Sequence, residues 1–232
     1  DLERTITVRR TRAEHGLRDL KLAGHVVVLE RHTTGLRCRD ENVFARNDRS
    51  RVIDDAVTGE EQSKILQQLN GARWRYGWPV NDAPYVRPCW HSFVAGSQRM
   101  EQRSAEGELR EHEQWQVLAG FWDRVKAAHM PDATLLGVYA NGQTFGQDSP
   151  IHRDNKASEQ GLTVVMFCNE HWASSWGGEL VFYDHAKQNI IKSVLPKPGR
   201  IVIFNGHVPH SARSPAATCD RLRMTLAFKT LI

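Results

Sequence analysis

The sequence predicts an α+β chain that is mainly β, in which the second half forms an antiparallel sandwich or barrel. From Pro131 onward, short β-rich runs alternate with turns, and no helical segment lies between them. This spacing is typical of antiparallel sheets. Two amphipathic segments precede the runs, and we expect them to be helices that cover one sheet. The predicted strands are residues 134–141, 161–169, 177–184, 189–195, 199–205 and 221–230.

The two predicted helices are residues 58–70 and 106–128. The first begins with Thr58, a good N-cap, and has acidic residues in its first turn, as helix starts commonly do. In both segments apolar residues recur at helical spacing and should face a core. These residues are Ile65, Leu66 and Leu69 in the first segment, and Leu109, Leu118, Trp122 and Val125 in the second.

The domain organisation expected from these patterns is a single domain with an elaborated periphery. Residues 1–130 would form an N-terminal extension with the supporting helices, and residues 131–232 the β-rich core. Residues 1–57 are expected to be irregular and charged, apart from a strand at 25–30. The Trp-, Pro- and Gly-rich stretch 72–96 is expected to be packed but irregular.

The composition narrows the protein class. No apolar run approaches the roughly 18 residues that a membrane-spanning helix needs, so no membrane partner is expected. The four cysteines show no CxxC spacing, which favours a reducing compartment and a cytoplasmic protein. The net charge is +4 with the arginines concentrated near the start. That region is either a patch for an anionic partner or a solvated mixed-charge periphery; no nucleic-acid-binding motif supports the former. The sequence does not define an oligomeric state.

A candidate metal site begins at "PIHRDN", residues 150–155. On an extended backbone, His152 and Asp154 point to the same side, and an imidazole with a carboxylate supplies two ligands of a first-row metal. Further along, His207 and His210 follow the strand 199–205. A nitrogen ligand from this turn would complete a two-His, one-carboxylate triad, which leaves open positions on ferrous iron.

The second half also contains an ordered set of motifs that spans Leu135–Thr230. On these motifs the sequence resembles the Fe(II)/2-oxoglutarate dioxygenases, in their prolyl-hydroxylase-like branch. The resemblance implies a double-stranded β-helix core, also called a jelly-roll or cupin-like fold, with the N-terminal helices packed on one sheet. The motifs are "GVYANG" with Tyr139, "HRDN", "LTVVMFCNEHW", "GGELVFYD", "PKPGRIVIFNGHVPHSA" and "DRLRMTLAFK".

The resemblance implies Fe(II), 2-oxoglutarate and O₂ as cofactors, with His152, Asp154 and His210 as the metal ligands and catalytic centre. His210 is preferred to His207 because the family's second His follows the strand-end Phe by about six positions, and His210 stands six positions after Phe204.

The family holds 2-oxoglutarate with a cation from the last strand, and a guanidinium suits a carboxylate. Two candidates are present, Arg221 and Arg223, and strand alternation cannot separate them. Many relatives also use a Tyr on the strand after His-x-Asp, where this chain has Phe167. Tyr139, Thr163 or Thr225 would then orient the cosubstrate carboxylates.

The implied activity couples oxidative decarboxylation of 2-oxoglutarate to C–H hydroxylation. The expected partner is a small-molecule substrate, a polar or amino-acid-like metabolite. Alternatives are a protein side-chain hydroxylase of the prolyl type, a nucleic-acid demethylase and a non-catalytic metal sensor. The substrate-contact candidates are Trp90, His91, Arg99 and Trp172. Alternatively, the Trp residues could pack the helices against the sheet.

Overall fold

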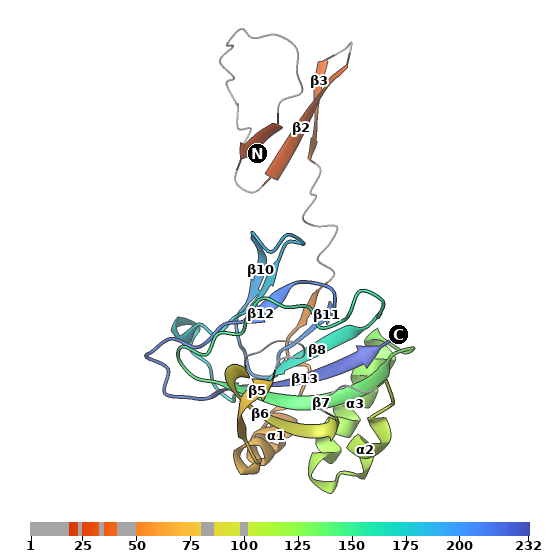
Figure 1. The fold of residues 1–232 in the computed structure, drawn as a ribbon, viewed down its shortest axis with the longest axis vertical. Coiled ribbons are helices and arrows are strands. Elements are labelled where there is room, and N and C mark those ends of the chain that lie inside the picture. The colour runs from red at the N-terminus through yellow and green to blue at the C-terminus, as the bar shows by residue number, and fades with distance from the viewer. Residues whose placement is uncertain (1–18, 23–24, 33–34, 41–49, 80–85, 98–101) are drawn as a thin grey trace. The chain divides into compact units, whose positions relative to one another are not determined.

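The computed structural model describes residues 19–22, 25–32, 35–40, 50–79, 86–97 and 102–232 (Figure 1). The chain divides into two compact units, Asp1–Asn47 and Asp48–Ile232. In the first unit the strands β1 (Asp19–Leu22), β2 (His25–His32) and β3 (Gly35–Asp40) form an antiparallel sheet in the order β1-β2-β3. The predicted strand at 25–30 is therefore present as part of β2, whereas β1 and β3 replace chain that was predicted to be irregular.

The second unit contains two antiparallel sheets. The seven-stranded sheet has the order β4-β11-β8-β13-β7-β6-β5, and the three-stranded sheet has the order β10-β9-β12. The mainly β, double-stranded β-helix prediction describes this architecture. The strands are β4 (Arg51–Ile53), β5 (Arg75–Pro79), β6 (Val86–Gly96), β7 (Thr134–Gln143), β8 (Leu162–Phe167), β9 (Leu180–Tyr183), β10 (Ile190–Val194), β11 (Ile201–Asn205), β12 (His210–Ala212) and β13 (Arg223–Leu231).

The described part of the chain contains three α-helices: α1 (Gly59–Gly71) precedes β5, and α2 (Glu106–Glu111) and α3 (Gln116–His129) lie between β6 and β7. Two 3₁₀ turns are present, η1 (Glu113–Trp115) and η2 (Ser174–Trp176). The start of α1 follows the prediction, because Thr58 and Glu61 form a reciprocal capping box. The single helix predicted over 106–128 is wrong. The backbone leaves the helical region at His112 (φ −79°, ψ 97°), and η1 then carries Trp115 into the core.

Two hydrophobic cores lie on opposite faces of the seven-stranded sheet. On β13, Met224, Leu226 and Phe228 belong to the larger core, which also contains buried residues of α1, α2 and α3. The smaller core joins β8 and β11 to β9 and β10, so it lies between the two sheets. Because side chains alternate along a strand, Arg223 and Lys229 face away from the larger core.

The strands β5 and β6 occupy the stretch that was predicted to be irregular. β5 is an edge strand of the seven-stranded sheet, where Pro and Gly are tolerated. Its pairing with β6 shifts register between Tyr76 and Trp78, and Gly77 has φ of +86°. The short strands β4 and β12 were also not predicted. The predicted subdivision into residues 1–130 and 131–232 stays a prediction, although strands from both parts share one sheet.

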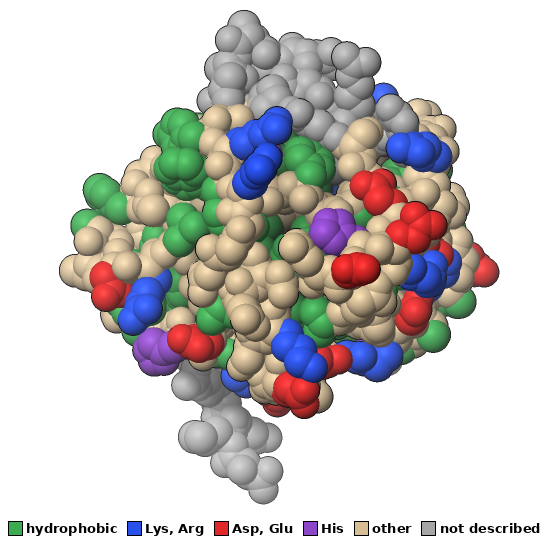
Figure 2. Space-filling model, turned by 90° about the horizontal axis from the view of Figure 1, so that it is seen from below, with side chains coloured by type: hydrophobic (Ala, Val, Ile, Leu, Met, Phe, Trp, Pro, Cys, Tyr) green, Lys and Arg blue, Asp and Glu red, His purple; other side chains and the backbone are tan. Residues whose placement is uncertain are grey.

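The exposed charges are mixed in sign. On the face drawn in Figure 2, acidic and basic side chains are interspersed. Several exposed charges of the described residues form ion pairs, including Arg124 with Glu61 and Arg110 with Asp123. No helix in the described part of the chain is long and apolar enough to cross a membrane. The arginines at residues 1–18 and 41–49 lie outside the described residues.

Phe228 is predicted to anchor α3 on the sheet, because its ring is 6.0 Å from that of Trp122 and 5.3 Å from that of Phe121, measured between centroids. Phe228→Ala should lower the free energy of unfolding by about 3–5 kcal/mol through the cavity that it leaves. Urea denaturation measures the change. Phe145→Ala is the matched control, since Phe145 is 66% exposed. Similar losses in both variants would contradict this role.

Candidate metal centre

His152 and His210 are brought together by the backbone. They form an isolated antiparallel bridge, with each amide N–H donating to the other's carbonyl oxygen at 3.0 and 2.9 Å. Directly opposed residues of such a pair project their side chains to the same face. The two imidazole ring centroids are consequently 4.3 Å apart.

The turn that carries Asp154 is fixed by close packing against two glycines. The amide N–H groups of Asp154 and Asn155 both donate to the carbonyl oxygen of Gly206, at 2.8 and 3.2 Å. A Cβ atom at Gly206 would lie 1.5 Å from Asn155 Oδ1, and one at Gly161 would lie 2.7 Å from Asn155 Nδ2. The "HRDN" segment therefore needs glycine at both positions.

His207 belongs to the same turn region but takes a different partner. Its Nε2 atom is 2.7 Å from the carbonyl oxygen of Glu159, and its own carbonyl oxygen accepts from Arg153 Nε at 3.0 Å. Arg153 also donates to the carbonyl oxygen of His185. His207, in the turn after β11, therefore contacts the segment that carries Arg153 and Glu159.

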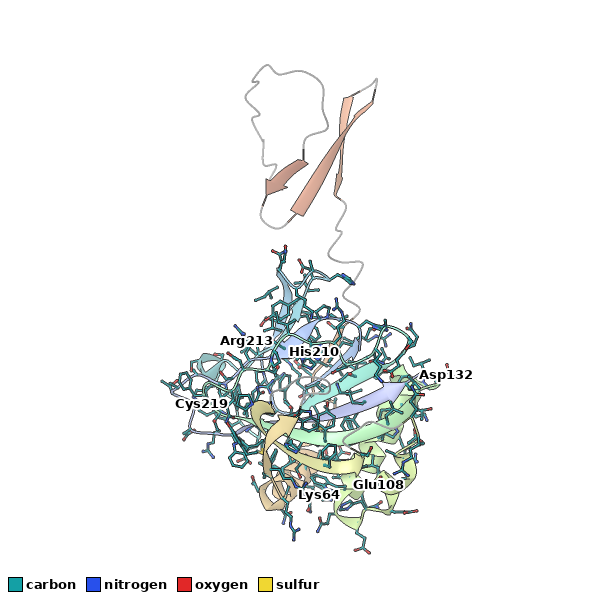
Figure 3. All side chains as sticks on the ribbon, viewed as in Figure 1. Lys64, Glu108, Asp132, His210, Arg213 and Cys219 are labelled. Atoms are coloured by element: carbon teal, nitrogen blue, oxygen red, sulfur yellow. The ribbon has the colours of Figure 1, made fainter. Side chains whose placement is uncertain are left out.

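The three predicted ligands converge. Asp154 Oδ1 is 3.5 Å from His152 Nε2, and Asp154 Oδ2 is 3.4 Å from His210 Nε2. Each Nδ1 atom lies 2.9 Å from a carbonyl oxygen, that of Pro150 or Val208. A carbonyl only accepts, so Nδ1 carries the proton and each Nε2 lone pair is free for a metal. This donor set fits Fe(II), and Figure 3 shows His210 toward the interior of the unit.

The charged groups at this centre favour an ionised carboxylate at Asp154. Burial alone would raise the pKa of Asp154, but Lys229, His210 and His152 hold it well below its ordinary value. Burial lowers the pKa of His210 to about 3, which keeps its ring neutral. Thr163 Oγ1 donates to Asp154 Oδ2 at 2.7 Å, and Lys229 Nζ contacts the same oxygen.

The structure separates the two candidate arginines. The Arg221 side chain is 64% exposed, whereas Arg223 is 1% exposed. Arg223 Nε donates to the carbonyl oxygen of Gly178 at 2.6 Å, and Nη1 donates to Gln143 Oε1 at 2.9 Å. Its Nη2 is buried without a hydrogen-bond partner, and its guanidinium lies over the Phe167 ring. Burial lowers the pKa of Arg223 to about 10. An orphaned buried donor of this kind fits an anionic ligand.

The other predicted cosubstrate residues lie on neighbouring strands of the same sheet. Thr225 is buried and pairs with Phe167 on one side and Asn141 on the other. Tyr139 lies on β7, which neighbours β13 on the side away from β8, and its ring centroid is 5.9 Å from Lys229 Nζ. The hydroxyl of Thr163 donates to Asp154 Oδ2, so Thr163 stabilises the carboxylate of the centre.

Of the predicted substrate residues, His91 is linked to Lys229 through the rings of Trp78 and Tyr139. Its ring contacts Trp78 and Phe93, and Trp78 contacts Tyr139 at 4.8 Å between centroids. His91 Nδ1 is buried without a partner; burial and Arg75 lower its pKa.

The remaining substrate candidates have other surroundings. The ring of Trp90 stacks edge-on against the exposed Tyr76. Trp172 packs at Gly178 beside Arg223, where an added Cβ would meet both side chains at 3.1 Å. Arg99 lies outside the described residues.

Lys229, Gln143 and Trp78 were missed by the sequence analysis. Lys229 could have been found from the pattern, because it has the same strand parity as Arg223 and Thr225. Gln143 and Trp78 carry no sequence signal, since their partners are distant along the chain.

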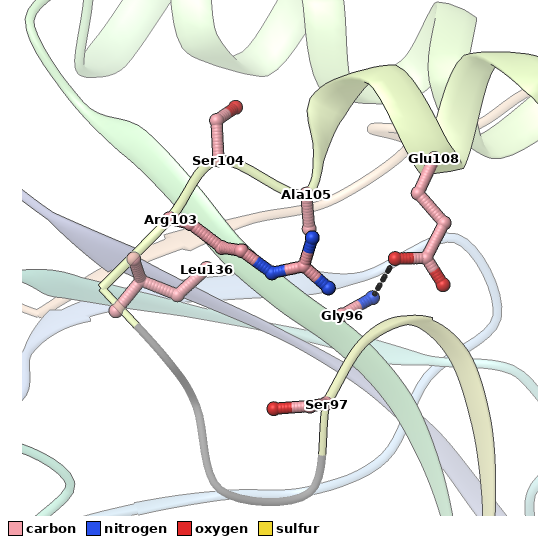
Figure 4. Close-up of a pocket in the computed structure, with 7 residues that line it drawn as sticks. All are labelled: Gly96, Ser97, Arg103, Ser104, Ala105, Glu108 and Leu136. Atoms are coloured by element: carbon pink, nitrogen blue, oxygen red, sulfur yellow. Dashed lines mark hydrogen bonds between the residues drawn. The ribbon is translucent and has the colours of Figure 1, made fainter.

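A small pocket lies away from the centre, between the end of β6, the start of α2 and β7 (Figure 4). The amide N–H of Gly96 donates to Glu108 Oε2 at 3.0 Å, and Ser97 Oγ is buried without a partner. None of the three converging residues lines it.

Comparison with known proteins supports the same chemistry. The sequence model of the "2OG-Fe(II) oxygenase superfamily" matches residues 136–229. No curated protein matches the sequence. Among solved structures, the chain is similar to a prolyl hydroxylase from Trichoplax adhaerens, in complex with a hypoxia inducible factor oxygen degradation domain peptide fragment. That structure has TM-score 0.58 and 16% identity, with 78% of this chain and 83% of that chain covered.

Two further structures are similar to this chain. One is a prolyl-4-hydroxylase from Pseudomonas putida, with TM-score 0.52, 16% identity and 81% and 95% of the two chains covered. The other is a viral collagen prolyl hydroxylase from Paramecium Bursaria Chlorella virus-1 in its 2OG complex, with TM-score 0.51, 13% identity and 78% and 95% covered.

These likenesses correct one prediction. The expected small-molecule partner is wrong, because the similar structures are prolyl hydroxylases and one of them holds a peptide. Aromatic and Arg residues near a metal motif do not reveal whether a site encloses a metabolite or admits a side chain from a longer polymer. Residues 136–229 thus match the 2OG-Fe(II) oxygenase superfamily, and together with the three converging ligands they form a dioxygenase domain that uses Fe(II), 2-oxoglutarate and O₂, with a fold similar to that of prolyl hydroxylases.

Proposed function

We propose that this dioxygenase hydroxylates prolyl residues of a peptide or protein. The observation that carries the proposal is the similarity of its fold to three prolyl hydroxylases, over 78–81% of this chain. The aromatic cluster of Trp78, His91, Phe93 and Tyr139 supports it. Tyr139 of this cluster lies 5.9 Å from Lys229 Nζ, and aromatic faces offer packing surface for a compact apolar ring such as that of proline.

We assign the metal to His152, Asp154 and His210. Iron together with 2-oxoglutarate, when bound, supplies the activation of O₂ that oxidises a C–H bond. The protein's contribution is to hold the three ligands in place. The backbone bridge sets the two imidazoles, the two carbonyl contacts at Nδ1 set their tautomers, and the Gly206 turn sets the carboxylate.

We assign Arg223 as the anchor for the far carboxylate of 2-oxoglutarate, in preference to Arg221. Its guanidinium is buried and keeps one donor unpaired, and Gln143 and Gly178 fix its orientation. A dianion would compensate this buried charge. Phe167 replaces the Tyr donor that relatives use, and its ring supports the guanidinium instead.

The metal assignment predicts different outcomes for the two histidines of one turn. His210→Ala and His152→Ala should abolish both Co(II) binding and succinate release, because each removes one of three protein ligands. His207→Ala is the matched control and should retain both. Titration with Co(II), followed by its visible absorption, measures binding. Loss of binding in His207→Ala alone would reverse the assignment.

The anchor assignment is tested by Arg223→Leu against Arg221→Leu. Removing a charge-assisted hydrogen bond costs about 1.5–3 kcal/mol, which corresponds to roughly a 10- to 150-fold weaker apparent affinity for 2-oxoglutarate. We expect this loss in Arg223→Leu and less than a twofold change in Arg221→Leu. Calorimetric titration of 2-oxoglutarate into the Co(II)-loaded protein separates the two. A weaker affinity only in Arg221→Leu would transfer the role to that residue.

Substrate class is tested by succinate release with a pool of proline-containing peptides. We expect these peptides to stimulate turnover and to gain one oxygen atom on proline by mass spectrometry. The same peptides with alanine in place of proline, and free proline, are the controls and should not stimulate it. Stimulation by a methylated oligonucleotide instead of the peptides would favour a demethylase and would reject the proposal.

A further inference from the structure

We propose that Lys229 is a built-in counter-cation of the metal centre: it neutralises Asp154 when no metal is bound and thereby lowers the affinity of the centre for the metal. The inference rests on the assignment of Asp154 as a metal ligand under the proposed function. It concerns how strongly the enzyme retains its metal, which the assignment of ligands alone does not address.

The first observation is the contact itself. Lys229 Nζ makes an ion pair with Asp154 Oδ2, and it also donates to Thr163 Oγ1 at 3.3 Å. The hydroxyl of Thr163 in turn donates to the same carboxylate oxygen. Asp154 Oδ2 therefore has two protein donors, while Oδ1 faces His152 Nε2.

The second observation is burial. The side chains of Asp154 and Lys229 are 6% and 14% exposed, so water screens neither charge effectively. Among the residues that the structure describes, Asp154 is the one carboxylate paired with Lys229. The carboxylate and the ammonium therefore pair with each other where water is largely excluded.

The third observation is the origin of Lys229 in the fold. β13 pairs Lys229 with Thr163 of β8 across the sheet, and both residues face away from the larger core. The ammonium therefore reaches the centre from a rigid central strand. It is not placed there by a surface loop.

These facts have opposite consequences for the metal-free and metal-bound states. Without metal, the ammonium stabilises a buried carboxylate that would otherwise be unpaired. With metal, the same ammonium faces a divalent cation across one carboxylate and opposes its binding. Losing a hydrogen bond to a metal ligand typically weakens binding by about 10- to 100-fold. Removing the ammonium also removes its repulsion of the metal cation, which strengthens metal binding. In a buried site we expect this gain in affinity to exceed the loss from the missing hydrogen bond.

The test compares Lys229→Met with Lys229→Arg and with the control Lys64→Met. Lys64 is an exposed residue of α1 that pairs with Glu60. Co(II) is titrated into each metal-free protein, and thermal unfolding is recorded with and without Co(II), so no turnover is required. We expect Lys229→Met to bind Co(II) at least tenfold more tightly and to unfold at a lower temperature without metal. Lys229→Arg keeps the cation and should stay within about threefold of the unaltered protein, and Lys64→Met should be unchanged.

Other results decide against the proposal. Unchanged or weaker Co(II) binding in Lys229→Met would overturn it. If Lys229→Met does not fold without metal, the proposal requires that Co(II) restores the fold; a chain that stays unfolded with Co(II) contradicts it. His210→Ala distinguishes this failure from that of the metal assignment, because it must lose Co(II) whatever Lys229 does.

Discussion

The structure of this enzyme is organised around one buried carboxylate. Asp154 is surrounded by two imidazoles, a hydroxyl and an ammonium, and its charge is retained only because these groups compensate the loss of water. In the metal-free state a buried carboxylate without such partners would become protonated, and a bound metal ion would take over this compensation. Backbone hydrogen bonds and two glycines position the turn that carries this residue, and a lysine from a central strand pairs with its carboxylate.

The seven-stranded sheet makes that arrangement possible because its two faces have different tasks. Its larger core, shared with the helices, is apolar and supplies most of the buried side chains. The opposite face can then carry Arg223, Thr225 and Lys229 along a single strand. Alternation along β13 thus couples the packing of Phe228 against α3 to the position of Lys229 at the centre.

If Arg223 anchors the cosubstrate as proposed, Phe167 changes how that end of the site is built. Where relatives use a Tyr hydroxyl, this chain presents an aromatic face under a guanidinium. Gln143 and the carbonyl oxygen of Gly178 orient that guanidinium. The left-handed backbone at Gly178 (φ +75°) leaves space for the Arg223 side chain, which a Cβ atom would approach at 3.1 Å.

The sequence by itself predicted the chemistry and most of the strands in the second half of the chain. The His-x-Asp pair, the second histidine after Phe204 and the alternating runs are local patterns, and residues two apart on extended backbone necessarily share a side. The Thr58 cap of α1 is local for the same reason. The break at His112 and the strands β5 and β6 were not predictable, because distant partners overrode local preference there. Only the tertiary structure favours Arg223 over Arg221 as the proposed anchor, because Arg223 is buried beside Gln143 and Gly178 whereas Arg221 is exposed. The tertiary structure also revealed the contact between Lys229 and Asp154. Strand alternation gives the face of β13 on which Lys229 lies, but not its partner, because Asp154 lies on a turn that is distant in the sequence.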